Sequence, residues 1–172
     1  MKRLGNTVMN VLVPAQETLS LANIDALVIE QDTHLLLGVD EVIRYPRGSL
    51  SDLVREAEDA KAIQPGTVLP RGKQPVRLLA VVHDLDENPS WRPEWVKQAL
   101  ATVFRFAVGR KVRRLAMPVL GAVHGQMPIE AFATFLAQNL QQTEMDFPER
   151  LILLAPPDAD SEFIAKVFAA TG

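Results

Sequence analysis

From residue 77 onward, short apolar runs of strand length alternate with longer segments of helical periodicity. Residues 77–83 (RLLAVVH) and 151–155 (LILLA) are nearly continuous apolar runs, which are typical of strands buried on both faces. Apolar residues at helical spacing predict helices over 93–109, 128–140 and 161–171. Such alternation indicates right-handed β-α-β units and a mainly parallel sheet.

The first half of the chain is less regular but fits the same architecture. Apolar runs predict strands over 7–13 and 24–29, and a short edge strand over 67–69. Helices are expected to begin near Gly38 and Ser49. We therefore predict a single α/β domain of 172 residues, a three-layer α/β/α sandwich with a mixed, mainly parallel sheet.

Composition narrows the classes of function. The chain has 18 basic and 21 acidic residues and no cysteine, so disulfides and thiolate metal sites are excluded. A net charge of −3 argues against a nucleic-acid partner, and we interpret the basic residues 109–114 as a solvated loop. No apolar run reaches the roughly 18 residues of a membrane span. We expect a cytoplasmic protein with no membrane partner, no metal and no cofactor.

Two loops are candidate ligand sites. Residues 34–40 follow the second predicted strand, and residues 121–125 (GAVHG) follow a strand predicted over 114–119. Ligands of such sheets bind beyond the carboxyl ends of the strands, where loops lead into helices. Glycine allows close backbone approach, and a helix N-terminus favours an anion. The two loops could hold two phosphates, or their glycines could serve only as turn residues.

Five segments, taken in order, resemble the macro domain, a module associated with ADP-ribose. IDALVI (24–29) is similar to the V-D-A-I-V-N strand of that family, and LLLGVDEVIRYPRG (35–48) is similar to its glycine-rich segment. Residues 66–83, NPSW (88–91) and MPVLGAVHGQMP (117–128) are similar to later family blocks, the last being the second phosphate loop. The resemblance implies a macro-domain-like fold that holds ADP-ribose or a related nucleotide phosphate.

The resemblance assigns roles residue by residue. Asp40 matches an aspartate that activates water in the hydrolase branch of the family, although the helix dipole alone would also favour an acid there. His83, at the end of its strand, matches a chiefly structural histidine. The implied ligand-binding residues are Asp32, Gly38, Val39, Asp40, Gly121, Ala122, Val123, His124 and Gly125.

Several positions depart from the family pattern. Residues 29–32 (IEQD) stand where the family has asparagines, Leu35, Leu36 and Leu37 replace glycines, and Val123 replaces another. Three hypotheses therefore remain. The chain binds ADP-ribose or a related nucleotide at the two loops; or it has lost that site and acts as a structural or protein-interaction module, with homo-oligomerisation as one form; or it hydrolyses ADP-ribosyl bonds with Asp40.

Overall fold

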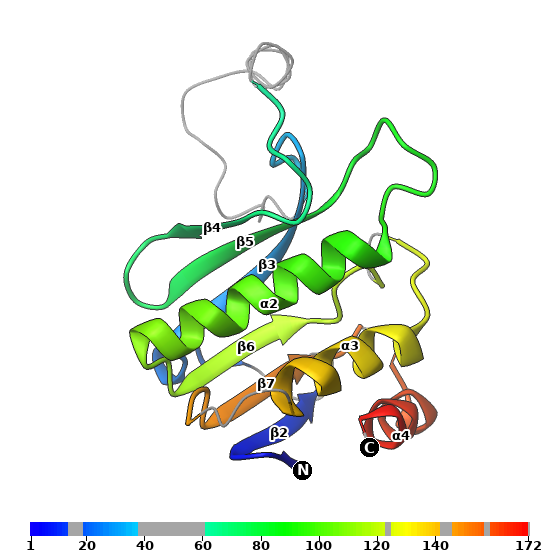
Figure 1. The fold of residues 1–172 in the computed structure, drawn as a ribbon. Coiled ribbons are helices and arrows are strands. Elements are labelled where there is room, and N and C mark those ends of the chain that lie inside the picture. Colours follow the sequence, from blue (N-terminus) through cyan, green and yellow to red (C-terminus); the bar gives the residue numbers. More distant parts are fainter. Residues whose placement is uncertain (14–18, 38–60, 123–124, 142–145, 157–158, 172) are drawn as a thin grey trace.

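The computed structural model describes residues 1–13, 19–37, 61–122, 125–141, 146–156 and 159–171 (Figure 1). The strands are β1 (Lys2–Leu4), β2 (Thr7–Leu12), β3 (Ala26–Asp32), β4 (Val68–Arg71), β5 (Val76–His83), β6 (Arg114–Pro118) and β7 (Arg150–Leu154). The helices are the 3-10 turn η1 (Leu21–Asn23) and the α-helices α2 (Pro93–Arg110), α3 (Ile129–Gln141) and α4 (Ser161–Ala170).

The strands form one seven-stranded sheet in the order β1-β2-β7-β6-β3-β5-β4. The five inner strands run parallel to one another. At the two edges, β1 pairs antiparallel with β2 and β4 pairs antiparallel with β5. The predicted mixed, mainly parallel sheet is therefore confirmed, as is the edge strand near residues 67–69. The sequence did not predict β1, which is only three residues long and largely polar.

The main hydrophobic core lies on one face of the sheet. Alternate strand residues enter it, among them Val28, Ala80, Leu115 and Leu153, because successive side chains point to opposite faces. All three described α-helices contribute to the same core, and α2 crosses β5, β3 and β6 in Figure 1. The predicted helices near Gly38 and Ser49 lie outside the described residues.

Helix α2 begins as predicted but ends later. Pro93 occupies the first turn, where its missing N–H is not needed. The helix continues past Gly109 to Arg110, and Lys111 caps it in the left-handed conformation at φ 54°. Val112 is 5% exposed and donates its N–H to the carbonyl of Ala107 at 2.8 Å. This buried residue after the cap moves the helix end beyond the glycine.

Helix α4 packs less deeply than the sequence predicts. The sequence pattern predicts an inward face made of Phe163, Ile164, Val167 and Phe168, and of these only Val167 is fully buried. Phe163 and Phe168 are partly buried against the core. The helix packs against α3 at the β1 end of the molecule, so the core covers only one side of each ring.

Truncating Leu100 to alanine should lower the free energy of unfolding by about 2–5 kcal/mol, because the side chain is fully buried in α2 and leaves a cavity. Val108→Ala on the same helix is the matched control, since Val108 is 41% exposed, and should change stability by less than about 0.5 kcal/mol. Urea denaturation measures both. Equal losses would contradict the buried face assigned to α2.

Candidate functional site

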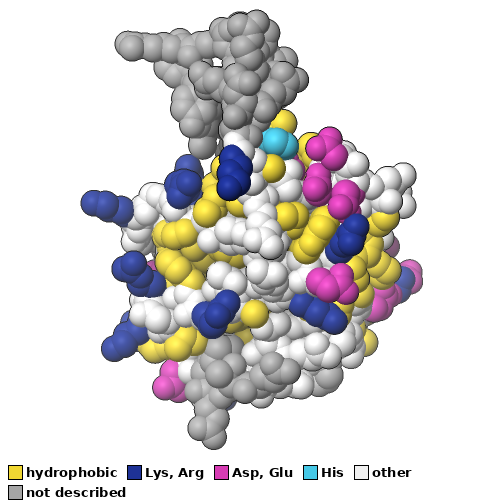
Figure 2. All heavy atoms as spheres, turned by 45° about the horizontal axis from the view of Figure 1, so that its top comes forward, with side chains coloured by type: hydrophobic (Ala, Val, Ile, Leu, Met, Phe, Trp, Pro, Cys, Tyr) yellow, Lys and Arg dark blue, Asp and Glu magenta, His cyan; other side chains and the backbone are white. Residues whose placement is uncertain are grey.

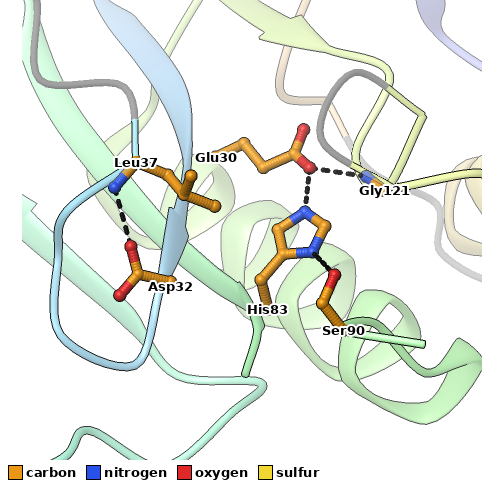
Figure 3. A network of polar contacts seen from close by, with 6 residues as sticks. All are labelled: Glu30, Asp32, Leu37, His83, Ser90 and Gly121. Atoms are coloured by element: carbon orange, nitrogen blue, oxygen red, sulfur yellow. Dashed lines mark hydrogen bonds and ion pairs between the residues drawn. The ribbon is translucent and has the colours of Figure 1, made fainter. Parts of the chain in front are cut away.

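The two predicted loops lie at the same edge of the sheet. Strands β3 and β6 are parallel neighbours, so the loops that follow them leave the sheet side by side (Figure 3). Four of the predicted site residues are described, namely Asp32, Gly121, Ala122 and Gly125. Gly38, Val39, Asp40, Val123 and His124 lie outside the described residues, so their roles remain predictions.

Asp32 closes the first loop on itself. Its carboxylate is completely buried at the end of β3. One oxygen accepts a hydrogen bond from the N–H of His34 at 2.6 Å, and the other accepts from Leu36 and Leu37 at 2.8 and 2.7 Å. Backbone amides that point at one carboxylate form an anion site. Here the anion belongs to the protein, so these amides are already satisfied.

The same loop holds Leu35 in the left-handed region, at φ 59°. That conformation costs a non-glycine residue roughly 1–2 kcal/mol. Its N–H donates to the carbonyl of Asp32 at 3.0 Å, so backbone and side chain of one residue both hold the turn. The bonds to Asp32 offset the strain at Leu35, at one of the positions where the sequence has leucine in place of the family's glycine.

Glu30 joins the ends of three segments of the sheet edge. It lies two residues before Asp32 on β3 and is 5% exposed. Its Oε1 accepts from the N–H of Gly121 at 3.1 Å and is hydrogen-bonded to Nε2 of His83 at the end of β5 (Figure 3). Its Oε2 has no hydrogen-bond partner within the described part of the chain. The sequence alone does not predict this role of Glu30.

His83 extends this network to the loop before α2. The ring is completely buried, and its Nδ1 lies 3.0 Å from the hydroxyl of Ser90. Because a carboxylate only accepts, Nε2 donates to Glu30, and in the neutral ring Nδ1 then accepts from Ser90. The acid–histidine–serine order resembles a catalytic relay, but its histidine and acid are both buried. The network fixes two loops, in agreement with the structural role predicted for His83.

Gly125 allows a close approach, but the approaching group is a tryptophan. A Cβ at this position would lie 2.4 Å from Cδ1 of Trp91 and 2.6 Å from the carbonyl oxygen of Gly121. Trp91 is partly buried against the core and pairs with His83 in an isolated bridge. The space that the second loop's glycine leaves open is therefore filled by the protein itself.

The amides of residues 33–37, of Gly121 and of Ala122 are thus engaged internally. Ala122 donates to the carbonyl of Val119 at 3.2 Å, and Met127 to that of Gly121 at 3.2 Å. We call Glu30 and Asp32 the edge carboxylates, because they accept hydrogen bonds from described N–H groups of the two candidate loops, those of His34, Leu36 and Leu37 in the first and that of Gly121 in the second. The geometry supplies acceptors at this edge where a phosphate would need donors.

Within the described ranges, no three His, Asp or Glu side chains are grouped so as to hold a metal ion. No described helix combines the length and apolar character needed to cross a membrane.

Replacing Glu30 with alanine should destabilise the fold by about 2–5 kcal/mol, because it leaves buried donors on His83 and Gly121 without their acceptor. Glu87→Ala removes a glutamate whose bond to Arg92 is solvent-exposed and should cost less than about 1 kcal/mol. Chemical denaturation compares the two. If Glu30→Ala lowered the free energy of unfolding as little as Glu87→Ala, the network would not be what holds the edge together.

No protein-family model and no curated protein matches the chain. Solved structures do. A variant of the Oceanobacillus iheyensis macrodomain with ADPR aligns with a TM-score of 0.65 at 14% identity, over 98% of this chain and 94% of that one. The same macrodomain with ADP gives 0.65 at 13% identity, over 98% and 92%. The Thermus aquaticus DarG macrodomain gives 0.58 at 19% identity, over 88% and 99%.

These similarities extend over nearly the whole chain, and the mixed sheet and its flanking helices agree with them. At such low identity they establish architecture alone. The chain has the macrodomain fold.

Proposed function

We propose that this chain is a non-catalytic interaction module built on the macrodomain fold, in which the edge carboxylates occupy the amides that would hold a ligand's phosphates. The observation that carries the proposal is the carboxylate of Asp32, buried and bonded to three backbone N–H groups of its own loop. Glu30 takes the amide of Gly121 in the second loop in the same way.

The energetics favour this closed arrangement over a bound diphosphate. A phosphate at the first loop would have to displace Asp32 and leave its carboxylate buried without its three donors. An unpaired buried charge costs several kcal/mol. A phosphate beside the edge carboxylates would also meet like charge in a partly desolvated setting, where repulsion is stronger than in water.

The interaction surface that we propose is the same edge of the sheet. Leu36, in the loop after β3, and Leu85, after β5, are 44% and 50% exposed. Because β3 and β5 are parallel neighbours, both leucines follow strand ends at this edge. Exposed large apolar side chains near one another are a feature of contact surfaces. A second copy of the chain is the partner that we propose.

A nucleotide of the ADP-ribose class is the second candidate. It is favoured by the position of both loops at one edge and by the macrodomains solved with ADPR and ADP. Such a ligand would bind only by displacing the edge carboxylates. The hydrolase hypothesis depends on Asp40, which lies outside the described residues, and it remains a prediction without a described contact in its favour.

Thermal denaturation and amide NMR with ADP-ribose, ADP and AMP separate the two candidates. A ligand at a hundredfold excess over its dissociation constant stabilises a protein by about 2.7 kcal/mol. We expect none of the three to bind at the edge of the unmodified chain, so none should shift the amide NMR signals of residues 32–37 and 119–122. In Asp32→Ala the amides of residues 34–37 lose their internal acceptor, so ADP-ribose should stabilise this variant. Asp86→Ala, which removes an exposed acid, should behave like the unmodified chain.

Shifts of the amides of residues 32–37 and 119–122 when ADP-ribose is added to the unmodified chain would contradict the closed edge and support the second candidate. The absence of a ligand effect in both the unmodified chain and Asp32→Ala would leave the interaction module without a latent phosphate site.

Light scattering tests the interaction itself. We expect the chain to self-associate at high concentration, and the double variant Leu36→Ser/Leu85→Ser to remain monomeric, because it removes the apolar contact. Val108→Ser is the matched control, since Val108 is exposed on α2 and should leave association unchanged. A chain that stays monomeric at all concentrations would refute self-association as the function of this edge.

A further inference from the structure

A cavity of about 490 Å³ lies at the opposite end of the sheet from the edge carboxylates. Its walls come from the turn between β4 and β5, from the start of β5 and from the C-terminal end of α2. The side chains that matter are those of Arg71, Lys73, Arg110, Lys111, Phe106 and Val76. The volume is within the usual range of ligand sites, about 300–1,000 Å³.

Four of these side chains are cationic. Figure 2 shows Lys and Arg side chains gathered on the side of the molecule where Figure 1 places the β4–β5 turn and the end of α2. Within the described ranges, none of the four forms an ion pair. Asp25 also lines the cavity, but its carboxylate accepts from the amides of Arg113 and Arg114 at 3.0 and 2.8 Å.

The cluster is assembled by the fold. The sequence shows only the basic run at 109–114, which we interpreted as a solvated loop. The structure adds Arg71 and Lys73, about forty positions earlier, to the same cavity. Cations at the end of α2 would be explained by the helix dipole alone. That explanation does not cover the two from the β4–β5 turn, which face the same space.

Lys111 carries a second signal. It stands in the left-handed conformation, at φ 54°, where glycine is the residue without strain. A lysine in this position places a charged side chain at the cavity at a cost in backbone energy. Residues held in such conformations gather at functional sites.

We propose that this basic pocket binds a small phosphorylated molecule with an apolar body. The four cations would neutralise the phosphate, with the guanidinium groups of Arg71 and Arg110 suited to two hydrogen bonds each. Phe106 and Val76, partly buried against the core, supply the apolar wall. A pocket of this volume suits a small molecule, whereas a nucleic acid needs an extended surface.

The test uses the full chain and two probes, inorganic pyrophosphate and AMP, followed by amide NMR. Both probes should shift the amides of residues 71–76 and 106–112 and leave those of 119–122 unchanged, which separates this pocket from the edge between β3 and β6. AMP should bind more tightly than pyrophosphate, because only AMP has an apolar body. Lys73→Ala/Lys111→Ala should weaken both by about tenfold or more.

Two further variants control for general charge and for folding. Arg105→Ala removes an exposed cation of α2 that does not line the cavity, and should change affinity by less than about twofold. Lys111→Gly should raise the melting temperature by relieving the left-handed strain while still weakening AMP binding. If Lys111 had only a structural role, its replacement by glycine would raise the melting temperature without weakening AMP binding.

Several results would overturn the proposal. These are the absence of amide shifts at 71–76 and 106–112 with millimolar probe, an equal loss in Arg105→Ala, and unchanged AMP affinity in Lys111→Gly. A single-stranded oligonucleotide that binds through the same residues far more tightly than AMP would assign the pocket to nucleic acid instead. Shifts confined to 119–122 would support nucleotide binding at the edge and refute this site.

Discussion

The edge of the sheet where β3 and β5 end depends on the hydrogen bonds made by the buried carboxyl group of Glu30. One oxygen holds the amide of Gly121 and the ring of His83, and His83 in turn holds Ser90. Three strands and two loops therefore meet at one side chain. A buried carboxyl group is costly unless it is hydrogen-bonded, so the bonds to Oε1 favour the arrangement of the loops that supplies them.

The parts of the fold that the sequence predicts are those with a local cause. Continuous apolar runs predict β5 and β7, and helical spacing together with Pro93 predicts α2, because the pattern of apolar side chains indicates which residues are buried. The strand predicted over 24–29 instead continues through Asp32. Charged residues are usually exposed. Glu30 stays in the strand because its partners His83 and Gly121 come from elsewhere in the chain. Asp32 is instead held by the amides of its own loop.

The candidate site was predictable in place but not in chemistry. Glycines after strands indicated the correct edge, since Gly121 and Gly125 adopt the conformation or the close approach that requires glycine. What the glycines accommodate could not be predicted. The neighbours include Trp91 at Gly125 and Glu30 at Gly121, which are distant from them in sequence, so no local pattern reveals that the site is filled from within. The one available signal was the polar run 30–32 that ends the otherwise apolar strand β3.

The two ends of the sheet differ in charge in a way that the net value of −3 conceals. Where β3 ends, two buried acids use up the backbone donors. Where β3 and β5 begin, four cations face one cavity without acidic partners among the described residues. At the first end an anion would have to displace Asp32 or Glu30 from the amides that they accept from, and the displaced carboxylate would stay buried. At the second end an anion would reduce the repulsion among the four cations that the fold brings together. Electrostatics therefore favour binding of an anion at the end of the sheet where β3 and β5 begin. The topology of a parallel sheet would suggest the opposite end, where the strands finish.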